Sequence, residues 1–298
     1  MQFNSPATEA FPLEKLDEEY DFPDVSHIHD SVRHRYLYVI YKHKQVFRTK
    51  LPAGGAKLPP FYIHLKPGAK FTKQSLRRYG AKVSLYIYEK LQELLDQGLI
   101  VPCQAIAAAN VVVVQQKDRL RFCIDYRWIN DQSENLQYPI PHLRDLLQFL
   151  HGKKIFSVLD NKLGYHQLLV DEAIQFLLAF QTQFGMFMWT RCPFGHKTLP
   201  PWYNFLMSTV VFVGLLYTIL VCYFDDAVVA SNSHDDHINH LDIVLARYVK
   251  HDMILRGSKC QIAQESITFH GHIISANTIT HDPKRCQQVF EIPRPTTT

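Results

Sequence analysis

The sequence predicts a fold that contains both helices and strands, because runs with strand character and segments of helical periodicity both occur along it. Two strand-like runs, residues 154–160 and 220–230, are rich in apolar and β-branched side chains. Between residues 83 and 99, leucines recur at helical spacing until Gly98 ends the pattern. The chain has 298 residues, of which 47% are hydrophobic and 20% charged, so it can bury a full core. It is therefore predicted to be globular.

The overall charge is compatible with a nucleic-acid partner without requiring one, since the formal net charge is only +4. Basic residues concentrate between Lys42 and Arg78, which predicts either a surface that faces phosphates or a solvated basic face. Six scattered cysteines without a CxxC pair favour free thiols in a reducing, intracellular and cytoplasmic compartment over disulfides or a zinc module. Residues 1–30 are polar and acidic, so no signal peptide is expected there.

The first third of the chain gives mainly local signals. Residues 1–37 are predicted to be a poorly ordered leader, acidic at first and then rich in histidine. Residues 38–60 contain the proline and glycine typical of an extended connection, and residues 61–70 predict a short strand and a turn. The amphipathic helix expected after them buries leucines at four positions: Leu85, Leu91, Leu94 and Leu95.

Alternating strand and helix signals continue through the middle of the chain. Two strand runs, residues 105–114 and 120–126, flank a polar turn and predict a hairpin with basic residues at its tip. Residues 180–189 predict two further strand segments that turn at Gly185. A helix between these regions carries leucines at helical spacing: Leu143, Leu146, Leu147 and Leu150.

The run at residues 220–230 has two acids, Asp225 and Asp226, at the point where a hairpin should turn. A solvated turn is the ordinary interpretation of such a pair. The run at residues 154–160, however, also ends on an acid, Asp160, so the three carboxylates could meet at the ends of neighbouring strands. Adjacent carboxylates on an apolar sheet repel each other and lose hydration unless a cation lies between them. The pattern therefore indicates a site for two divalent metal ions.

Three motifs, in this order and at this spacing, resemble the reverse transcriptases of gypsy-type LTR retrotransposons. They are FSVLDNKLGYHQ at residues 156–167, CPFG at residues 192–195 and YFDD at residues 223–226. The resemblance begins near Tyr38 and reaches the last residue. It implies a right-hand polymerase of the α+β class, with a fingers subdomain and a palm formed by a ferredoxin-like mixed sheet.

The resemblance also implies a domain organisation. Residues 38–60 would be the linker that precedes the polymerase, residues 61–150 mainly fingers, and residues 151–298 mainly palm. The palm would end in the primer-grip region, before the connection and RNase H. Other parts of a pol polyprotein would be possible partners, and a retroelement particle a possible location.

By resemblance, the activity would be RNA-directed DNA polymerisation, in which deoxynucleotides are added to a primer by two-metal phosphoryl transfer. The substrates would be deoxynucleoside triphosphates and a primer on an RNA or DNA template. Asp160, Asp225 and Asp226 would bind two Mg²⁺ ions, for which Mn²⁺ could substitute. Lys259, in the segment LRGSKC, would donate a proton to the departing pyrophosphate.

The remaining site residues are also implied by the motifs. Arg121 and Lys117 would bind the triphosphate, and Tyr165 would exclude a 2′-hydroxyl by steric clash. A solvated hairpin tip and a core aromatic are the alternatives for these residues. Phe194 and Gly195 would allow close backbone approach to a nucleotide or template. The primer grip would consist of four consecutive residues: Phe269, His270, Gly271 and His272.

Several departures from the family pattern favour a second interpretation, in which the chain is an inactive, decayed retroelement fragment that still binds nucleic acid. Pro200 and Pro201 replace a single proline, Leu177-Leu178 replaces a Lys-Thr pair, and apolar residues replace charges between residues 207 and 220. Asp125 and Arg127, which resemble a family DYR motif, are expected to form a structural ion pair.

Two further alternatives concern local structure. Residues 205–224 lack charge and are long enough for a membrane anchor, although a helix near residues 202–213, a turn at Gly214 and a strand explain them better. The histidines from His234 to His240 could bind a metal. They fit better in a helix that begins after Ser233 and buries an apolar stripe made of Ile238, Leu241, Leu245 and Tyr248.

Overall fold

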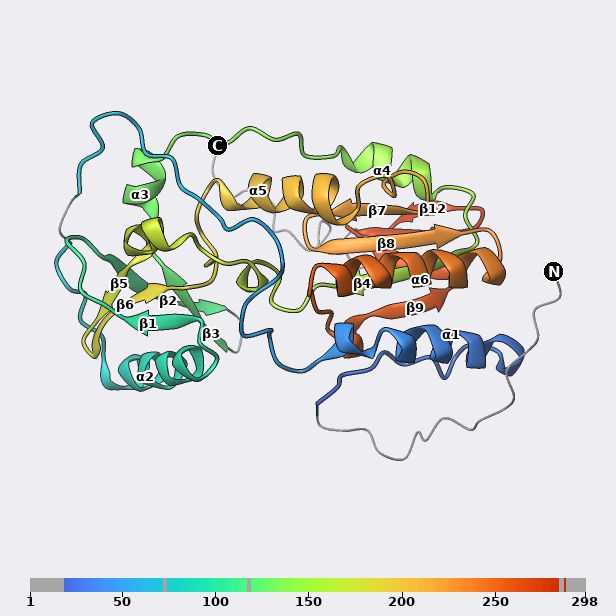
Figure 1. Ribbon diagram of the computed structural model, residues 1–298, viewed down its shortest axis with the longest axis horizontal. Helices are drawn as coiled ribbons and strands as arrows, with labels where there is room; N and C mark the ends of the chain where they lie inside the picture. The colour runs from blue at the N-terminus through green and yellow to red at the C-terminus, as the bar shows by residue number, and fades with distance from the viewer. Residues whose placement is uncertain (1–18, 72–73, 117–118, 284–286, 288–298) are drawn as a thin grey trace.

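A computed structural model of the chain describes residues 19–71, 74–116, 119–283 and 287. The helices and strands form two neighbouring lobes, each built on its own sheet (Figure 1). The predicted α+β class is confirmed. The segment after the first helix runs from one lobe to the other, and α5 (Leu199–Leu206) lies along the second lobe on the side that faces the first (Figure 1).

The first lobe contains a five-stranded sheet with the strand order β1-β6-β5-β2-β3. Neighbouring strands are antiparallel, except that β2 and β5 are parallel. The strands are β1 (Ile100–Pro102), β2 (Ala109–Gln116), β3 (Arg119–Ile124), β5 (Phe180–Thr182) and β6 (Gly185–Trp189). The helices of this lobe are α2 (Ala81–Asp96), α3 (Arg127–Gln132) and the short η3 (Glu172–Leu178).

Helix α2 is the predicted amphipathic helix, but its buried face differs from the expected one. Ile87, Leu91 and Leu94 are buried, as the i, i+4, i+7 spacing of one helix face requires. Leu85 is 58% exposed, so its assignment to the core was wrong. It precedes Ile87 by two residues and therefore points to the other side of the helix. Gly98 ends the helix as predicted and adopts a φ of +65°.

The second lobe contains a four-stranded sheet with the order β7-β8-β4-β9. A mixed sheet was expected to carry the acids, but every pairing in this sheet is antiparallel. The parallel pairing lies in the other lobe. The strands are β4 (Ile155–Asp160), β7 (Leu220–Tyr223), β8 (Asp226–Ser231) and β9 (Gln261–Gln264).

Both faces of this sheet are buried, which explains why its strands read as nearly continuous apolar runs. One face packs against α6 (His234–Lys250), which lies in front of the sheet in Figure 1. The other face packs against α4 (Leu143–Leu150) and a three-stranded sheet. Successive residues alternate between the two faces, as in Ile155 and Phe156. The small sheet contains β10 (Ser266–Phe269), β11 (His272–Ser275) and β12 (Ile279–His281).

The uncharged segment at residues 205–224 is divided among several elements. Helix α5 begins at Leu199 with Pro200 and Pro201 in its first turn, where proline costs no helical hydrogen bond. It continues into a π-helical turn, η4 (Met207–Val211), and Gly214 turns the chain before β7. Within the ranges that the structure describes, no helix is long and apolar enough to cross a membrane.

The predicted leader and linker are structured where they can be seen. Helix α1 (Asp30–Lys42) crosses the expected boundary at residue 37 and buries Tyr36, Val39 and Ile40 on one face. It packs against α6 and is followed by the short η1 (Lys44–Phe47). The sequence did not predict this helix, because most of its residues are polar and only three of them are buried. Residues 1–18 lie outside the described residues.

Several basic residues of the segment 42–78 form ion pairs inside the chain, which limits the predicted phosphate-facing surface. Lys42 pairs with Asp242 at 2.8 Å, Arg48 with Asp252, and Arg77 with Asp125 at 3.0 Å. The cysteines that the structure describes, all except Cys286, are free thiols as predicted.

The histidines of α6 serve the core. His237 is fully buried, with Nε2 2.7 Å from Ser157 Oγ and Nδ1 2.9 Å from Ser231 Oγ. Ser233 caps the helix by accepting a hydrogen bond from the Asp236 backbone N–H, as predicted. No group of three His, Cys, Asp or Glu side chains in the described ranges converges well enough to hold a metal ion.

Three buried histidines make the stability of the fold dependent on pH. Burial lowers the pKa of His237 to about 3 and the pKa values of His166 and His196 to about 4, from an ordinary 6.5. As the pH falls, the unfolded chain takes up a proton on each of these histidines before the folded chain does. The stability that the neutral, buried histidines contribute is therefore complete above pH 6.5 and is lost as the pH falls. Each histidine should remove about 1.4 kcal/mol per pH unit between pH 6 and pH 4.

Urea unfolding of the wild type and of His237→Gln across this pH range tests that expectation. The variant should show a slope that is shallower by about 1.4 kcal/mol per pH unit. His64→Gln, at an exposed position, serves as the control and should parallel the wild type. Equal slopes for all three proteins would contradict the prediction.

Candidate active site

Two of the three predicted acids face each other on paired strands. Asp160 is the last residue of β4, Asp226 is the first residue of β8, and the two are direct cross-strand partners. Side chains at such positions lie on the same face of the sheet, about 5 Å apart at their Cβ atoms. Asp225 immediately precedes Asp226 at the tip of the β7–β8 hairpin. The sheet therefore brings together the three carboxylates that were predicted to meet.

The hairpin tip is held in a strained conformation. Phe224 adopts a φ of +54°, which is uncommon for a residue with a bulky side chain. The neighbouring Asn161 donates from Nδ2 to the backbone carbonyl of Asp225 at 2.8 Å. Asn161 is buried, with only 5% of its surface exposed. A Cβ at Gly164 would lie 3.7 Å from Asp225 Cβ, so the loop after Asp160 packs closely against the tip.

The electrostatics of the site reflect first the burial of the acids and then their mutual repulsion. Burial, followed by the charges of Asp225 and Asp160, raises the pKa of Asp226 to about 6. Burial also raises the pKa of Asp160, while the charges of Lys259 and Arg256 act in the opposite direction. Both carboxylates would be stabilised by a nearby cation.

These residues fit a magnesium site that is completed by substrate. No cage of three acidic, histidine or cysteine ligands is formed among the described residues. Mg²⁺, however, is usually bound by one or two carboxylates together with phosphate oxygens and water. The hard carboxylate oxygens of Asp160, Asp225 and Asp226 have the chemistry for that role. The raised pKa values of Asp160 and Asp226 indicate that positive charge would stabilise their ionised forms.

A hollow of about 310 Å³ adjoins the tip of the hairpin. Tyr165 and Phe194 line it with rings 5.1 Å apart at their centroids. Burial and the charge of Asp225 raise the pKa of Tyr165 to about 12. Tyr165 also packs on Tyr203, so its ring is held from two sides. The other residues that line the hollow are Gly164, Pro200, Phe224 and Asp225.

Arg121 lies at a neighbouring hollow of about 260 Å³, which it lines together with Phe194 and Gly195. Arg121 belongs to β3, so the strand that carries it lies in the first lobe while the acids lie in the second. Lys117, the other predicted triphosphate ligand, lies outside the described residues.

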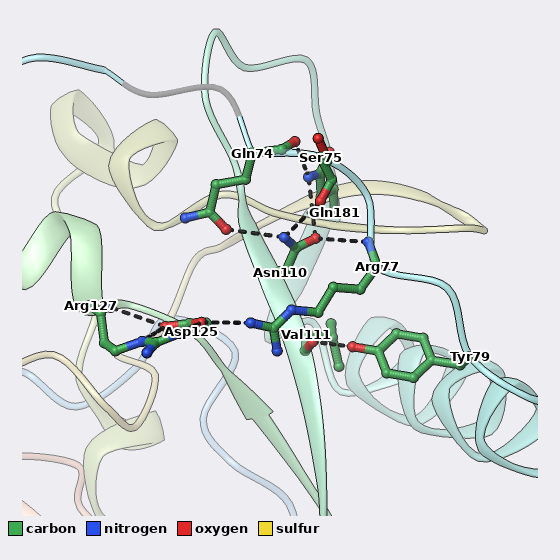
Figure 2. A network of polar contacts seen from close by, with 9 residues as sticks. All are labelled: Gln74, Ser75, Arg77, Tyr79, Asn110, Val111, Asp125, Arg127 and Gln181. Carbon is green, nitrogen blue, oxygen red and sulfur yellow. Dashed lines mark hydrogen bonds and ion pairs between the residues drawn. The ribbon is translucent and has the colours of Figure 1, made fainter.

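The predicted ion pair between Asp125 and Arg127 is present, with Nη2 2.6 Å from Oδ2. It belongs to a larger network, shown in Figure 2, that ties the segment before α2 to the five-stranded sheet. Arg77 reaches Asp125 from this segment, and Asn110 on β2 donates to Gln74 Oε1 at 3.1 Å. The network holds together the sheet that carries Arg121.

The four predicted primer-grip residues form the turn between β10 and β11. Phe269 is buried, whereas His270 and Gly271 form the turn with φ values of +46° and +83°. His270 Nε2 lies 3.6 Å from Asp226 Oδ2, and its ring lies 4.5 Å from that of Tyr223. His272 begins β11. The turn therefore contacts the hairpin that carries the acids.

Lys259 lies in η5 (Gly257–Lys259), a short 3₁₀ turn beside the end of β4. Its charge is the largest electrostatic influence that lowers the pKa of Asp160. The residues that flank this turn bond directly to the backbone of Asp160: Arg256 N–H donates to Asp160 O at 2.9 Å, and the Cys260 thiol Sγ accepts from Asp160 N–H at 3.4 Å.

Asn161, Pro200 and Phe224 belong to the site but were not predicted to be part of it. Asn161 follows a buried strand directly and carries a polar side chain, which is the one signal that could have identified it. Pro200 is distant in sequence from the acids and reaches the hollow only because α5 packs beside the β7–β8 hairpin. The short η2 (Gly164–Gln167) carries Tyr165, which also lines this hollow.

Comparison with known proteins gives a consistent result. The family described as reverse transcriptase (RNA-dependent DNA polymerase) matches residues 113–274. The enzymatic polyprotein of Figwort mosaic virus is 33% identical over 195 residues, which are 64% of this chain and 29% of the polyprotein. The Pol polyprotein from transposon 297 of Drosophila melanogaster is 28% identical over 216 residues, covering 70% of this chain and 20% of that protein.

A polyprotein of the Schizosaccharomyces pombe transposon Tf2-3 is 29% identical over 208 residues, covering 70% of this chain and 16% of that protein. The chain thus spans less than a third of the length of these relatives. Among solved structures, a foamy viral protease-reverse transcriptase in complex with an RNA/DNA hybrid superposes with a TM-score of 0.78 at 18% identity. It covers 90% of this chain and 36% of that one. The resemblance predicted from the three motifs is confirmed.

The repulsion among the acids should be measurable as a loss of stability. The pKa of Asp226 is raised in the folded chain, so the folded state binds this proton more tightly than the unfolded state. The stability that this proton contributes is complete below pH 4 and is lost as the pH rises through 6. At pH 7.5 in EDTA, Asp226→Asn should therefore increase the free energy of unfolding, by about 1 kcal/mol after solvent screening of the partly exposed carboxylate. Added Mg²⁺ should reduce this difference.

Asp242→Asn serves as a control of opposite sign. Burial raises the pKa of Asp242, but hydrogen bonds from Lys42 and His43 lower it overall, so this variant should destabilise the fold. If Asp226→Asn also destabilised the fold in EDTA, the ionised Asp226 would not be disfavoured by burial and by the neighbouring acids as described.

Proposed function

Since the chain belongs to the reverse transcriptase (RNA-dependent DNA polymerase) family, we propose that it extends a primer with deoxynucleotides on an RNA or DNA template. The observation that carries this proposal is the meeting of Asp160, Asp225 and Asp226 beside the hollow that Tyr165 lines. Foamy viral relatives of the same fold have been solved with an RNA/DNA hybrid and with double-stranded DNA, which supports primer-template as the partner.

In the proposed reaction, the primer 3′-hydroxyl attacks the α-phosphorus of a deoxynucleoside triphosphate, and pyrophosphate leaves. Asp160 and Asp225 would be the main ligands of the divalent ions, and Asp226 a weaker one. Two Mg²⁺ ions, or Mn²⁺ in their place, would stabilise the charge that develops on the attacking and leaving oxygens. Lys259, beside Asp160, would donate a proton to the pyrophosphate.

The other residues would position the substrates. Arg121 can bind triphosphate oxygens bidentately from the first lobe, and Lys117 would assist it. Phe194 lines both hollows, Gly195 lines the one beside Arg121, and the two residues would contact the nucleotide or the template. The turn formed by residues 269–272 would hold the primer end near Asp226, which His270 already approaches.

We assign residues 61–150 mainly to the fingers and residues 151–298 mainly to the palm of a right-hand polymerase. The β5–β6 hairpin comes from the second range and completes the five-stranded sheet of the first lobe. Helix α4, at the end of the first range, packs in the second lobe against β7. Other parts of a polyprotein are proposed partners, since the relatives are several times longer than this chain.

Primer extension tests the proposed function. Purified chain with Mg²⁺, a DNA primer and an RNA template should extend the primer, and Asp225→Asn should lose at least about a thousandfold in rate because it removes a metal-ligating charge. Asp236→Asn is the matched control, since Asp236 is exposed on α6, and it should extend normally.

The outcome also distinguishes the proposal from the alternative of an inactive fragment. If neither the wild type nor Asp225→Asn extends the primer, while both bind primer-template with strong salt dependence, the chain is a catalytically silent nucleic-acid-binding protein.

Tyr165 should set the choice of sugar. Replacing it by alanine would open the hollow beneath the sugar and admit a 2′-hydroxyl. Ribonucleotide incorporation relative to deoxynucleotide incorporation should therefore increase by about tenfold or more. Tyr165→Phe keeps the ring and should keep the preference. An unchanged ratio in Tyr165→Ala would show that this ring does not face the sugar.

A further inference from the structure

The segment at residues 19–49 is packed against the palm next to the acids, although it lies outside the matched family region. Its two ends are joined to each other: Asp21 N–H donates to Phe47 O at 2.7 Å, and Thr49 N–H donates to Glu19 O at 2.8 Å. Leu255, just before the turn that carries Lys259, donates its backbone N–H to Val46 O at 2.7 Å. The segment is therefore bonded to the chain beside the site.

Asp21 bonds directly to the η5 turn. One carboxylate oxygen accepts from the Ser258 backbone N–H at 3.1 Å, and the other accepts from Ser258 Oγ at 3.1 Å. The turn is attached to Asp160 on its other side, through the backbone of Arg256 and the thiol of Cys260. The turn that carries Lys259 is thus held between Asp21 and Asp160.

Gly257 shows how close this packing is. A Cβ built at Gly257 would lie 1.7 Å from Asp21 O and 2.8 Å from the carbonyl carbon of Phe22. These neighbours are backbone atoms, which cannot rotate away as a flexible side chain could. The absence of a side chain at residue 257 is therefore what allows the N-terminal segment to reach the turn.

The same segment also reaches the loop on the other side of Asp160. Lys162, two residues after Asp160, donates from Nζ to the backbone carbonyl of Thr49 at 2.5 Å. Its ammonium also interacts favourably with the charge of Asp21. The segment therefore contacts both chain segments that flank Asp160, one through Asp21 and one through Thr49.

We infer that residues 19–49 are a brace of the catalytic centre, in which Asp21 is a positioning residue that holds the Gly257–Lys259 turn against Asp160. Asp21 acts through the turn and does not touch the substrates. This role depends on the proposed polymerase function only for its effect on rate. The contact between Asp21 and the turn is independent of it.

Hydrogen exchange measures the contact without reference to activity. The backbone amides of Lys259 and Cys260 bond to the carbonyls of Arg256 and Gly257 and not to Asp21. Their exchange rates therefore report on the turn itself. Asp21→Ala should speed their exchange by about tenfold, as expected for a local opening that loses about 1.4 kcal/mol. Asp21→Asn keeps one acceptor oxygen and should restore most of the protection.

Steady-state primer extension measures the consequence. Asp21→Ala should lower kcat by about tenfold through misplacement of Lys259, while KM for the nucleotide and Kd for primer-template stay within about twofold. Asp24→Asn is the matched control: Asp24 lies on the same segment, is exposed, and accepts a hydrogen bond from the Ser26 backbone N–H, so this variant should match the wild type. Gly257→Ala should reduce kcat further because it displaces the segment.

Each outcome decides a separate point. Unchanged exchange at Lys259 and Cys260 in Asp21→Ala would overturn the brace, whether or not the wild type extends primers. Faster exchange with unchanged kcat would overturn the positioning role. A wild type that extends no primer, while Asp21→Ala still speeds exchange, would defeat the proposed function and leave the brace intact as a structural contact. A melting temperature of Asp21→Ala close to that of the wild type excludes general unfolding as the cause.

Discussion

Asp160, Asp225 and Asp226 repel one another where β4 meets the β7–β8 hairpin, and the packing around them supplies the free energy that keeps them together. The four-stranded sheet is buried on both faces, against α6 on one side and α4 with the small sheet on the other. Burying the apolar side chains on both faces of a sheet can outweigh a few kcal/mol of charge repulsion. The apolar contacts on the two faces of the sheet therefore offset the unfavourable electrostatics of the acids.

The same constraint explains why the neighbourhood of the acids is rich in backbone hydrogen bonds. Asp160 is fixed by the turn at residues 256–260, and Asp225 is fixed by the amide of Asn161. These bonds go to the backbone and leave the carboxylate oxygens available for cations. Phe224, with its positive φ, shows that the tip is held in a conformation that the chain would not adopt alone. A site arranged in this way has little need to reorganise when charge develops during a reaction.

Much of the fold and of the site could be predicted from local pattern. The strands that end on Asp160 and begin at Asp226, the helix capped by Ser233 and the helix at residues 143–150 are encoded by residues close together in sequence. Leu85 was misplaced, because several apolar residues compete for one helix face and only the partner surface selects among them. Helix α1 was missed, because its burial depends on α6, some 200 residues away.

The sequence by itself determined the class of the fold, the three acids and the family, because strand periodicity and motif order are local properties of the chain. Only the tertiary structure decided that Asp160 stands opposite Asp226, that Pro200 and Phe224 line the hollow of Tyr165, and that residues 19–49 reach the turn of Lys259. These relations join residues that are 35 to more than 200 positions apart, and no local preference specifies which distant surfaces pack together.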